Sequence, residues 1–156
     1  MIFRASVDID VALSLTNSKT LKGDLLKAKA QAMVFYLEEM IQEHFNYPSP
    51  NVKYNYKPNK LTYEIWKRKT HPNALYQLVL SGRLRNAVLN GKVDSRDGSI
   101  RFNLPEHGLY QLKAGRNFLD PNFADQLILQ DRIRRNLFFI RSYRAKAVSA
   151  RIDRRI

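Results

Sequence analysis

Arginines near the end of the chain are the residues whose type and spacing most clearly indicate a chemistry, the binding of anions. Beyond position 131 the chain carries nine lysines and arginines against one carboxylate, that of Asp153. Guanidinium groups bind phosphates and carboxylates through paired hydrogen bonds, so this composition suits a polyanion or an acidic protein. Together with two arginines of an earlier basic segment, the candidate contacts to an acidic protein partner or to the DNA backbone are Arg83, Arg85, Arg134, Arg135, Arg141, Arg144, Arg151, Arg154 and Arg155.

The sequence shows no catalytic or metal-binding set. The three histidines, His44, His71 and His107, are far apart, and the chain has no cysteine, so a zinc site has little support. Asp94 and Asp97 flank a turn, where aspartate serves the backbone, and the six glycines are scattered and form no phosphate loop. We expect no enzyme, no metal and no cofactor. A metal-dependent nuclease built from carboxylates distant in sequence is the weakest of three hypotheses.

Two long helices are expected to position the basic residues. The first spans about residues 18–45, where apolar side chains recur at helical spacing. The second begins at Asn122, and its apolar stripe consists of Leu129, Ile133, Leu137 and Ile140. At about 100° per residue the same direction is next reached at Arg144, where charge replaces the stripe. We therefore predict one α+β domain over residues 1–141 and a basic C-terminal helical arm over residues 142–156.

Short extended segments predict a small antiparallel β-sheet under these helices. Residues 2–11 alternate apolar and polar side chains, the pattern of a half-buried strand. The segments 88–94 and 99–104 flank an Asp97-Gly98 turn signal and predict a β-hairpin. Residues 109–112 can supply a third strand. The segment 113–121 predicts a tight loop that anchors Phe118 and Leu119.

A short helix is predicted over residues 61–69, with Leu61, Ile65 and Trp66 inward and Lys67, Arg68 and Lys69 outward. The apolar run 74–80 is compatible with helix or strand.

The sharply punctuated segment 81–88 is predicted to be a helical turn capped by Ser81. Gly82 is expected to permit close approach of another backbone. Leu84, Ala87 and Val88 are expected to face the core, with Arg83 and Arg85 largely on other faces.

Length and composition describe a folded, strongly basic protein. The chain has 156 residues, 44% of them hydrophobic, and a net charge of +13, which favours polyanions or acidic neighbours. The absence of cysteine is compatible with a reducing compartment, and no apolar run approaches the length needed to span a bilayer. Charges interrupt residues 1–10, so we expect no signal peptide and a soluble protein made in a cytoplasm.

Three segments, in order, resemble the phage tail-completion or virion-morphogenesis proteins of the head-to-tail joint. They are Leu-Thr-Tyr followed by Trp-Lys-Arg-Lys within residues 61–69, Ser-Gly-Arg-Leu-Arg-Asn-Ala-Val at residues 81–88, and Gly-Arg-Asn-Phe-Leu at residues 115–119. The likeness covers roughly residues 60–123. Leu80, Ala87 and Asn117 stand where the family usually has Asp, Ser and Pro.

The resemblance implies a structural protein of the virion neck or tail that is made in the host cytoplasm. Such proteins form rings, often sixfold, on the tail tube or between the tube and the head connector, with DNA passing through the lumen. The implied partners are further copies of the chain, in a hexamer, the tail tube and the head-connector proteins, with no membrane. Non-specific contact with packaged DNA is left open. The alternative is a basic nucleic-acid-binding accessory protein that contacts the DNA backbone without sequence specificity.

Overall fold

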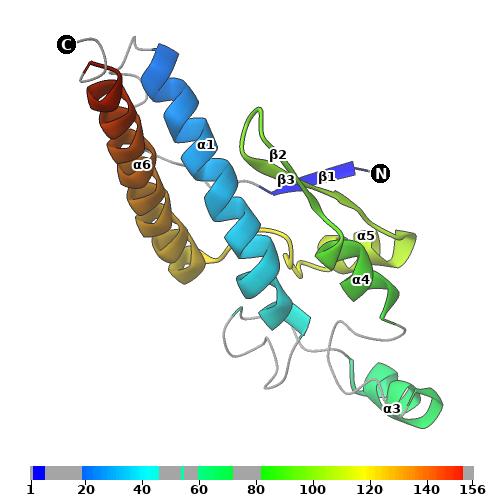
Figure 1. Cartoon of the computed structure of the whole chain (residues 1–156). Coiled ribbons are helices and arrows are strands. Elements are labelled where there is room, and N and C mark those ends of the chain that lie inside the picture. Colours follow the sequence, from blue (N-terminus) through cyan, green and yellow to red (C-terminus); the bar gives the residue numbers. More distant parts are fainter. Residues whose placement is uncertain (1, 6–18, 46–53, 55–59, 72–81, 153–156) are drawn as a thin grey trace.

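The computed structural model describes residues 2–5, 19–45, 54, 60–71 and 82–152, which form an α+β fold (Figure 1). The long N-terminal helix continues through a π-helical turn and a 3-10 turn. Along the chain, short helices and a hairpin separate it from the long C-terminal helix. The elements in chain order are β1 (Ile2–Ala5), α1 (Lys19–Phe35), η2 (Tyr36–Met40), η3 (Ile41–Phe45), α3 (Leu61–Thr70), α4 (Arg83–Leu89), β2 (Lys92–Asp94), β3 (Ser99–Asn103), α5 (Glu106–Lys113) and α6 (Phe123–Ile152).

The two long helices run antiparallel, and α1 lies between α6 and the sheet (Figure 1). The predicted α+β class is therefore confirmed, and the two long helices occupy different layers. Helix α1 packs on β2 and β3, while α6 packs on α1. The small buried residues Ala28 and Ala32 allow α1 to approach its neighbours closely.

The sheet is antiparallel with the strand order β1-β3-β2. Its core face carries Ile100 and Phe102, both fully buried, while Arg101 and Asn103 alternate with them on the exposed face. The β2–β3 hairpin is confirmed, although its first strand begins at Lys92 because residues 88 and 89 belong to α4. Gly98 closes the turn with φ +63°, a conformation that glycine adopts without strain.

The third strand of the sheet is β1, which pairs Phe3 with Phe102 and Arg4 with Arg101. The prediction of a strand over residues 109–112 is wrong, because these residues lie in α5. Pro105 leads into that helix with an extended conformation, and Glu106 stands favourably in its first turn. Within the expected strand 2–11, only residues 2–5 lie in the described part of the chain.

The core joins the inward face of α1 and its continuation to α4, β3, the loop before α6, and the first half of α6. Phe118 and Leu119 are buried there, as the loop prediction required. Tyr36 donates a hydrogen bond from its hydroxyl to the carbonyl oxygen of Leu119, at 3.4 Å. Residues 83 positions apart in sequence are thereby held together at the centre of the fold.

Helix α6 begins where the sequence predicts. The Asn122 side chain accepts the backbone N–H of Asp125 at 2.8 Å, and the Asp125 carboxylate accepts that of Asn122 at 3.4 Å. This reciprocal pair satisfies two N–H groups at the start of the helix.

The start of α4 differs from the prediction. Its N-cap is Gly82, with φ +73°, and Ser81, the predicted cap, lies outside the described residues. Gly82 provides a left-handed backbone conformation there, and among the described residues no atom lies within 4 Å of a Cβ built on it, so the expected close approach is not seen in that part of the chain. The inward residues are as expected, with Leu84 and Val88 buried. The undecided run 74–80 lies outside the described residues.

Candidate functional site

Helix α6 exposes large apolar side chains along much of its length, from the side opposite α1 to the edge of the α1–α6 contact, where Phe139 lies near Lys27 and Gln31. The buried residues Leu129 and Ile133 face α1, and at about 100° per residue Leu127 and Phe138 lie on the opposite side. Arginines stand among these side chains. We call this set the α6 surface, and it consists of Phe123, Leu127, Ile128, Arg134, Arg135, Phe138, Phe139 and Arg141.

The arginines predicted from the sequence divide into two groups on α6. Arg134, Arg135 and Arg141 are exposed, and Arg135 forms an ion pair with Asp131 one turn earlier. Arg144 instead reaches across to α1, where its two terminal nitrogens lie 2.8 Å from the two carboxylate oxygens of Asp24. Asp24 is 4% exposed, so Arg144 neutralises a buried charge and ties the two helices together.

The predicted boundary between domain and arm falls inside a continuous helix. Helix α6 runs unbroken past residue 142 to Ile152, and the Arg144–Asp24 pair lies within the predicted arm. The division of the chain at residue 142 stays a prediction. Arg151 belongs to the last described turn of α6, and Arg154 and Arg155 lie outside the described residues.

The remaining two predicted arginines lie on α4, far in sequence from α6. Arg83 and Arg85 are both exposed, as the helical spacing predicted. Arg83 lines a shallow open groove with Glu106 and His107 at the start of α5. Tyr110, 77% exposed, lies at the same groove.

Helix α3 agrees with the prediction only in part: Arg68 and Lys69 are exposed as expected, but the residues expected to face inward are exposed too. Leu61, Ile65 and Trp66 are exposed by 75%, 59% and 45%, and we call them the α3 surface. Lys67 is buried instead, at 2% exposure. Burial lowers the pKa of Lys67, the Glu64 carboxylate partly restores it, and the Arg116 guanidinium lowers it further. Lys67 is therefore the side chain of α3 that turns inward, within reach of the Arg116 charge in the loop before α6.

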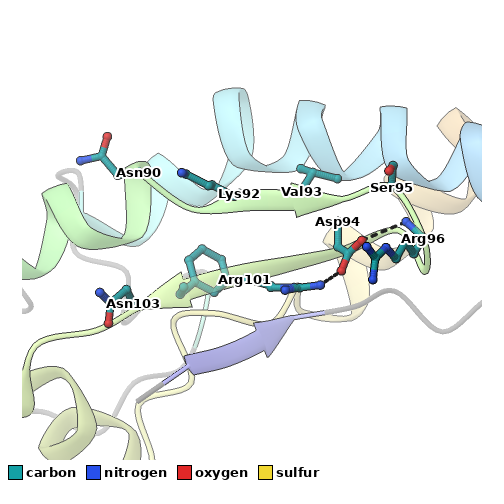
Figure 2. Close-up of a pocket in the computed structure, with 9 residues that line it drawn as sticks. Asn90, Lys92, Val93, Asp94, Ser95, Arg96, Arg101 and Asn103 are labelled. Carbon is teal, nitrogen blue, oxygen red and sulfur yellow. Dashed lines mark hydrogen bonds and ion pairs between the residues drawn. The ribbon is translucent and has the colours of Figure 1, made fainter.

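A second cationic feature, which the sequence reasoning missed, lies along the β2–β3 hairpin. An open groove of about 800 Å³ runs beside it, and Figure 2 shows Asp94 between Arg96 and Arg101 at one end. The Asp94 carboxylate accepts the backbone N–H of Arg96 at 3.0 Å and forms an ion pair with Arg101. The other end carries amide groups, and the polar lining consists of Asn90, Lys92, Asp94, Ser95, Arg96, Arg101 and Asn103.

The histidines are ordinary packing or surface residues in the described chain. His44 is fully buried and stacks on the Tyr54 ring, with the centroids 3.7 Å apart. The described residues contain no group of three or more His, Cys, Asp or Glu side chains able to hold a metal ion. Among the described helices, none is both long enough and apolar enough to cross a membrane.

Comparison with known proteins yields no match: neither a protein-family model nor a curated protein nor a solved structure resembles the chain significantly.

Proposed function

We propose that the protein is a structural component of the bacteriophage neck or tail, a tail-completion or tail-terminator ring protein that joins the tail tube to the head connector around the DNA channel. The observation that carries the proposal is the presence of two separate exposed apolar surfaces on one small chain. They are the α6 surface and the α3 surface, on elements that share no extensive contact. A subunit of a closed ring must contact more than one neighbour through different patches.

The composition of the α6 surface supports contact with protein. Phe138 and Phe139 are 68% and 58% exposed, and their rings lie edge to face at a centroid distance of 6.0 Å. Aromatic residues and arginine are enriched at the centres of protein interfaces, where lysine and glutamate are depleted. Large exposed apolar patches on a folded chain mark binding sites for protein or membrane.

The second and third of the segments that carry the family resemblance share one hydrophobic core, which also supports the proposal. Leu84 and Val88 of the second segment share the hydrophobic core with Phe118 and Leu119 of the third. The third segment also carries Arg116, whose charge acts on Lys67 of the first. Segments that pack in one core depend on one another, so we expect them to occur together in the members of a family.

The test is the mass and shape of the purified full-length protein. We expect light scattering to give a multiple of the 18.2 kDa subunit mass, and electron microscopy to show rings that cap isolated tail tubes or connectors. Exchanging the two adjacent aromatics of α6, Phe138→Ser and Phe139→Ser, should abolish ring formation and leave the circular dichroism spectrum unchanged. A matched double exchange of exposed α1 residues, Lys19→Ser and Lys22→Ser, should leave the rings intact.

A wild-type protein that stays monomeric at high concentration and ignores both tubes and connectors would contradict the proposal. Arg83→Glu gives a second check at a different place. Arg83 is exposed beside Tyr110, so the subunit should fold while assembly is impaired. Normal assembly of this variant would remove Arg83 from the interface.

The alternative is a basic nucleic-acid-binding accessory protein, which the net charge of +13 favours. That function requires no ring and makes no use of the α3 surface. The ring and the accessory protein are therefore separated by the oligomeric state and by the effect of the paired aromatic exchange.

A further inference from the structure

Three cations lie in one row across the sheet. The strand register places Arg4 of β1 opposite Arg101 of β3, and Arg101 opposite Lys92 of β2. Paired residues on neighbouring strands project from the same face, and adjacent strands lie about 4.8 Å apart. All three residues are exposed, on the face opposite the buried Ile100 and Phe102. This face of the sheet is turned away from α1.

Without a bound anion, this row of cations destabilises the sheet. Like charges directly opposite one another on neighbouring strands destabilise the pairing. Arg96 of the turn adds a fourth cation, and the described carboxylates that pair with this group are two, Asp94 with Arg101 and Asp97 with Arg4 at 3.6 Å. The face therefore keeps an excess of positive charge that internal ion pairing does not balance.

We propose that this face, the row of Arg4, Arg101 and Lys92 with Arg96 beside it, binds the phosphate backbone of double-stranded DNA. The ligand class follows from the chemistry of the face. The exposed residues described on the two hairpin strands are all charged or amide side chains, Lys92, Arg101 and Asn103. Such groups contact phosphate and sugar oxygens, and base reading needs an element that enters a groove of the duplex. A protein partner would instead be expected to bury exposed apolar side chains, as on the α6 surface.

The inference goes beyond the proposed ring and does not require it. It assigns DNA contact to residues that differ from the arginines of α4 and α6, and it holds for whatever oligomer the protein forms. In a ring it would place the sheet toward the nucleic acid and leave the α6 surface for protein.

The experiment measures binding of the full-length protein to a fluorescent 30-base-pair duplex over a range of salt concentrations. Each phosphate contact contributes about −0.9 to the slope of log K against log salt concentration. The double variant Arg4→Gln with Lys92→Gln should therefore have a slope shallower by about 1.8 than wild type. The matched control is Lys22→Gln with Lys27→Gln, which removes the same charge from exposed positions on α1 and should change the slope far less.

Three results would overturn the inference. The first is a wild-type protein that does not bind the duplex at low salt, and the second is an equal change in slope for the test and control variants. The third is competition by polyglutamate, per charge, as strong as that by unlabelled duplex, which would assign the face to an acidic protein. Thermal unfolding of each variant shows whether the fold is kept, and Arg4→Lys with Lys92→Arg, which keeps both charges, should restore the slope if folding is intact. Whether or not the protein binds the duplex, ring formation is measured separately, so the failure of one proposal does not decide the other.

Discussion

Helices α1 and α6 are both long and basic, yet they use their charges differently. In α1 the four cations are all lysines, and the helix buries a continuous inward face that includes Ala28, Ala32 and Met33. In α6 all the cations but Lys146 are arginines, and most of the large apolar side chains whose burial is described, up to residue 147, are exposed. One helix is the centre of the fold, and the other is attached to it along one side.

The difference shows that net charge alone does not identify a binding surface. The ammonium group of lysine is strongly hydrated, so the exposed lysines of α1 are a solvated outer face. Arginine is more weakly hydrated and stacks on aromatic rings, which suits surfaces that lose water on contact. Within this molecule Arg132 already does so, with its guanidinium 3.6 Å from the centre of the Phe35 ring.

The largest expected effect comes from removing a core side chain of α1. Met33 is fully buried, and Met33→Ala should lower the free energy of unfolding by about 2–5 kcal/mol because it leaves a cavity. The matched change on α6, Phe138→Ala, should cost less than about 0.5 kcal/mol in the unassembled protein, because that ring is 68% exposed. Chemical denaturation of both variants measures the contrast, and equal losses would remove the distinction between the helices.

The next effect tests the ion pair that joins the two helices. Arg144→Gln leaves the buried Asp24 carboxylate without its partner and should cost about 1–3 kcal/mol. Arg141→Gln, which changes an exposed arginine one turn earlier, should be nearly neutral. If the two variants were equally stable, the Asp24 pair would contribute nothing to docking α6 on α1.

A smaller effect is expected where Arg132 covers the Phe35 ring. Arg132→Gln removes the cation from the ring face and should cost about 0.5–1 kcal/mol. Arg132→Lys keeps the charge and should recover part of the loss. Arg134→Gln, on the α6 surface, is the control, and a loss of the same size there would point to a general effect of charge on the helix.

The smallest effect concerns pH and the turn on the other side of α1. Ser99, whose backbone N–H donates to the Asp97 carboxylate at 2.8 Å, and then the charges of Arg4 and Lys29 hold the pKa of Asp97 below its ordinary value of 3.8. Because the folded state favours the carboxylate, this stabilisation is fully present above about pH 5. It is lost as the pH falls below 3.8 through the lowered pKa.

The control for this pH dependence is Asp97→Asn. The variant should lose less stability than wild type between pH 6 and pH 3, with a difference below about 1 kcal/mol because the turn is solvated. Denaturant midpoints at the two pH values measure it. A larger loss in the variant would reverse the sign and contradict the lowered pKa.

Elements with a strong local pattern could be predicted from the sequence. The two long helices, the hairpin turn at Gly98, and the burial of Phe118 follow from periodicity and turn chemistry. Residues 109–112 could not be assigned correctly, because a short apolar and polar mixture fits strand and helix alike. In the folded chain these residues form the helix α5, so contacts distant in sequence select the helix over the strand.

The buried face of α3 and the cationic row could not be predicted from local spacing. Local amphipathicity places Leu61 inward, but Lys67 is the buried side chain, and one of the charges that acts on it belongs to Arg116, almost fifty residues later. The row appears only when the strand register sets Arg4 beside Arg101. No spacing within either segment carries that information. The Arg144–Asp24 pair could not be predicted for the same reason, because its two residues are 120 positions apart.

The π-helical turn η2, between α1 and η3, changes the phase of the long N-terminal helix. A π turn holds one residue more than an α turn, and each residue corresponds to a rotation of about 100°. Tyr36 and Met40 stay buried on either side of this extra residue, and Ile41, His44 and Phe45 follow on the core side. In a regular α-helix with the same sequence, the side chains of the last turn would point away from the core. The extra residue of the π turn therefore keeps the apolar face of η3 aligned with that of α1.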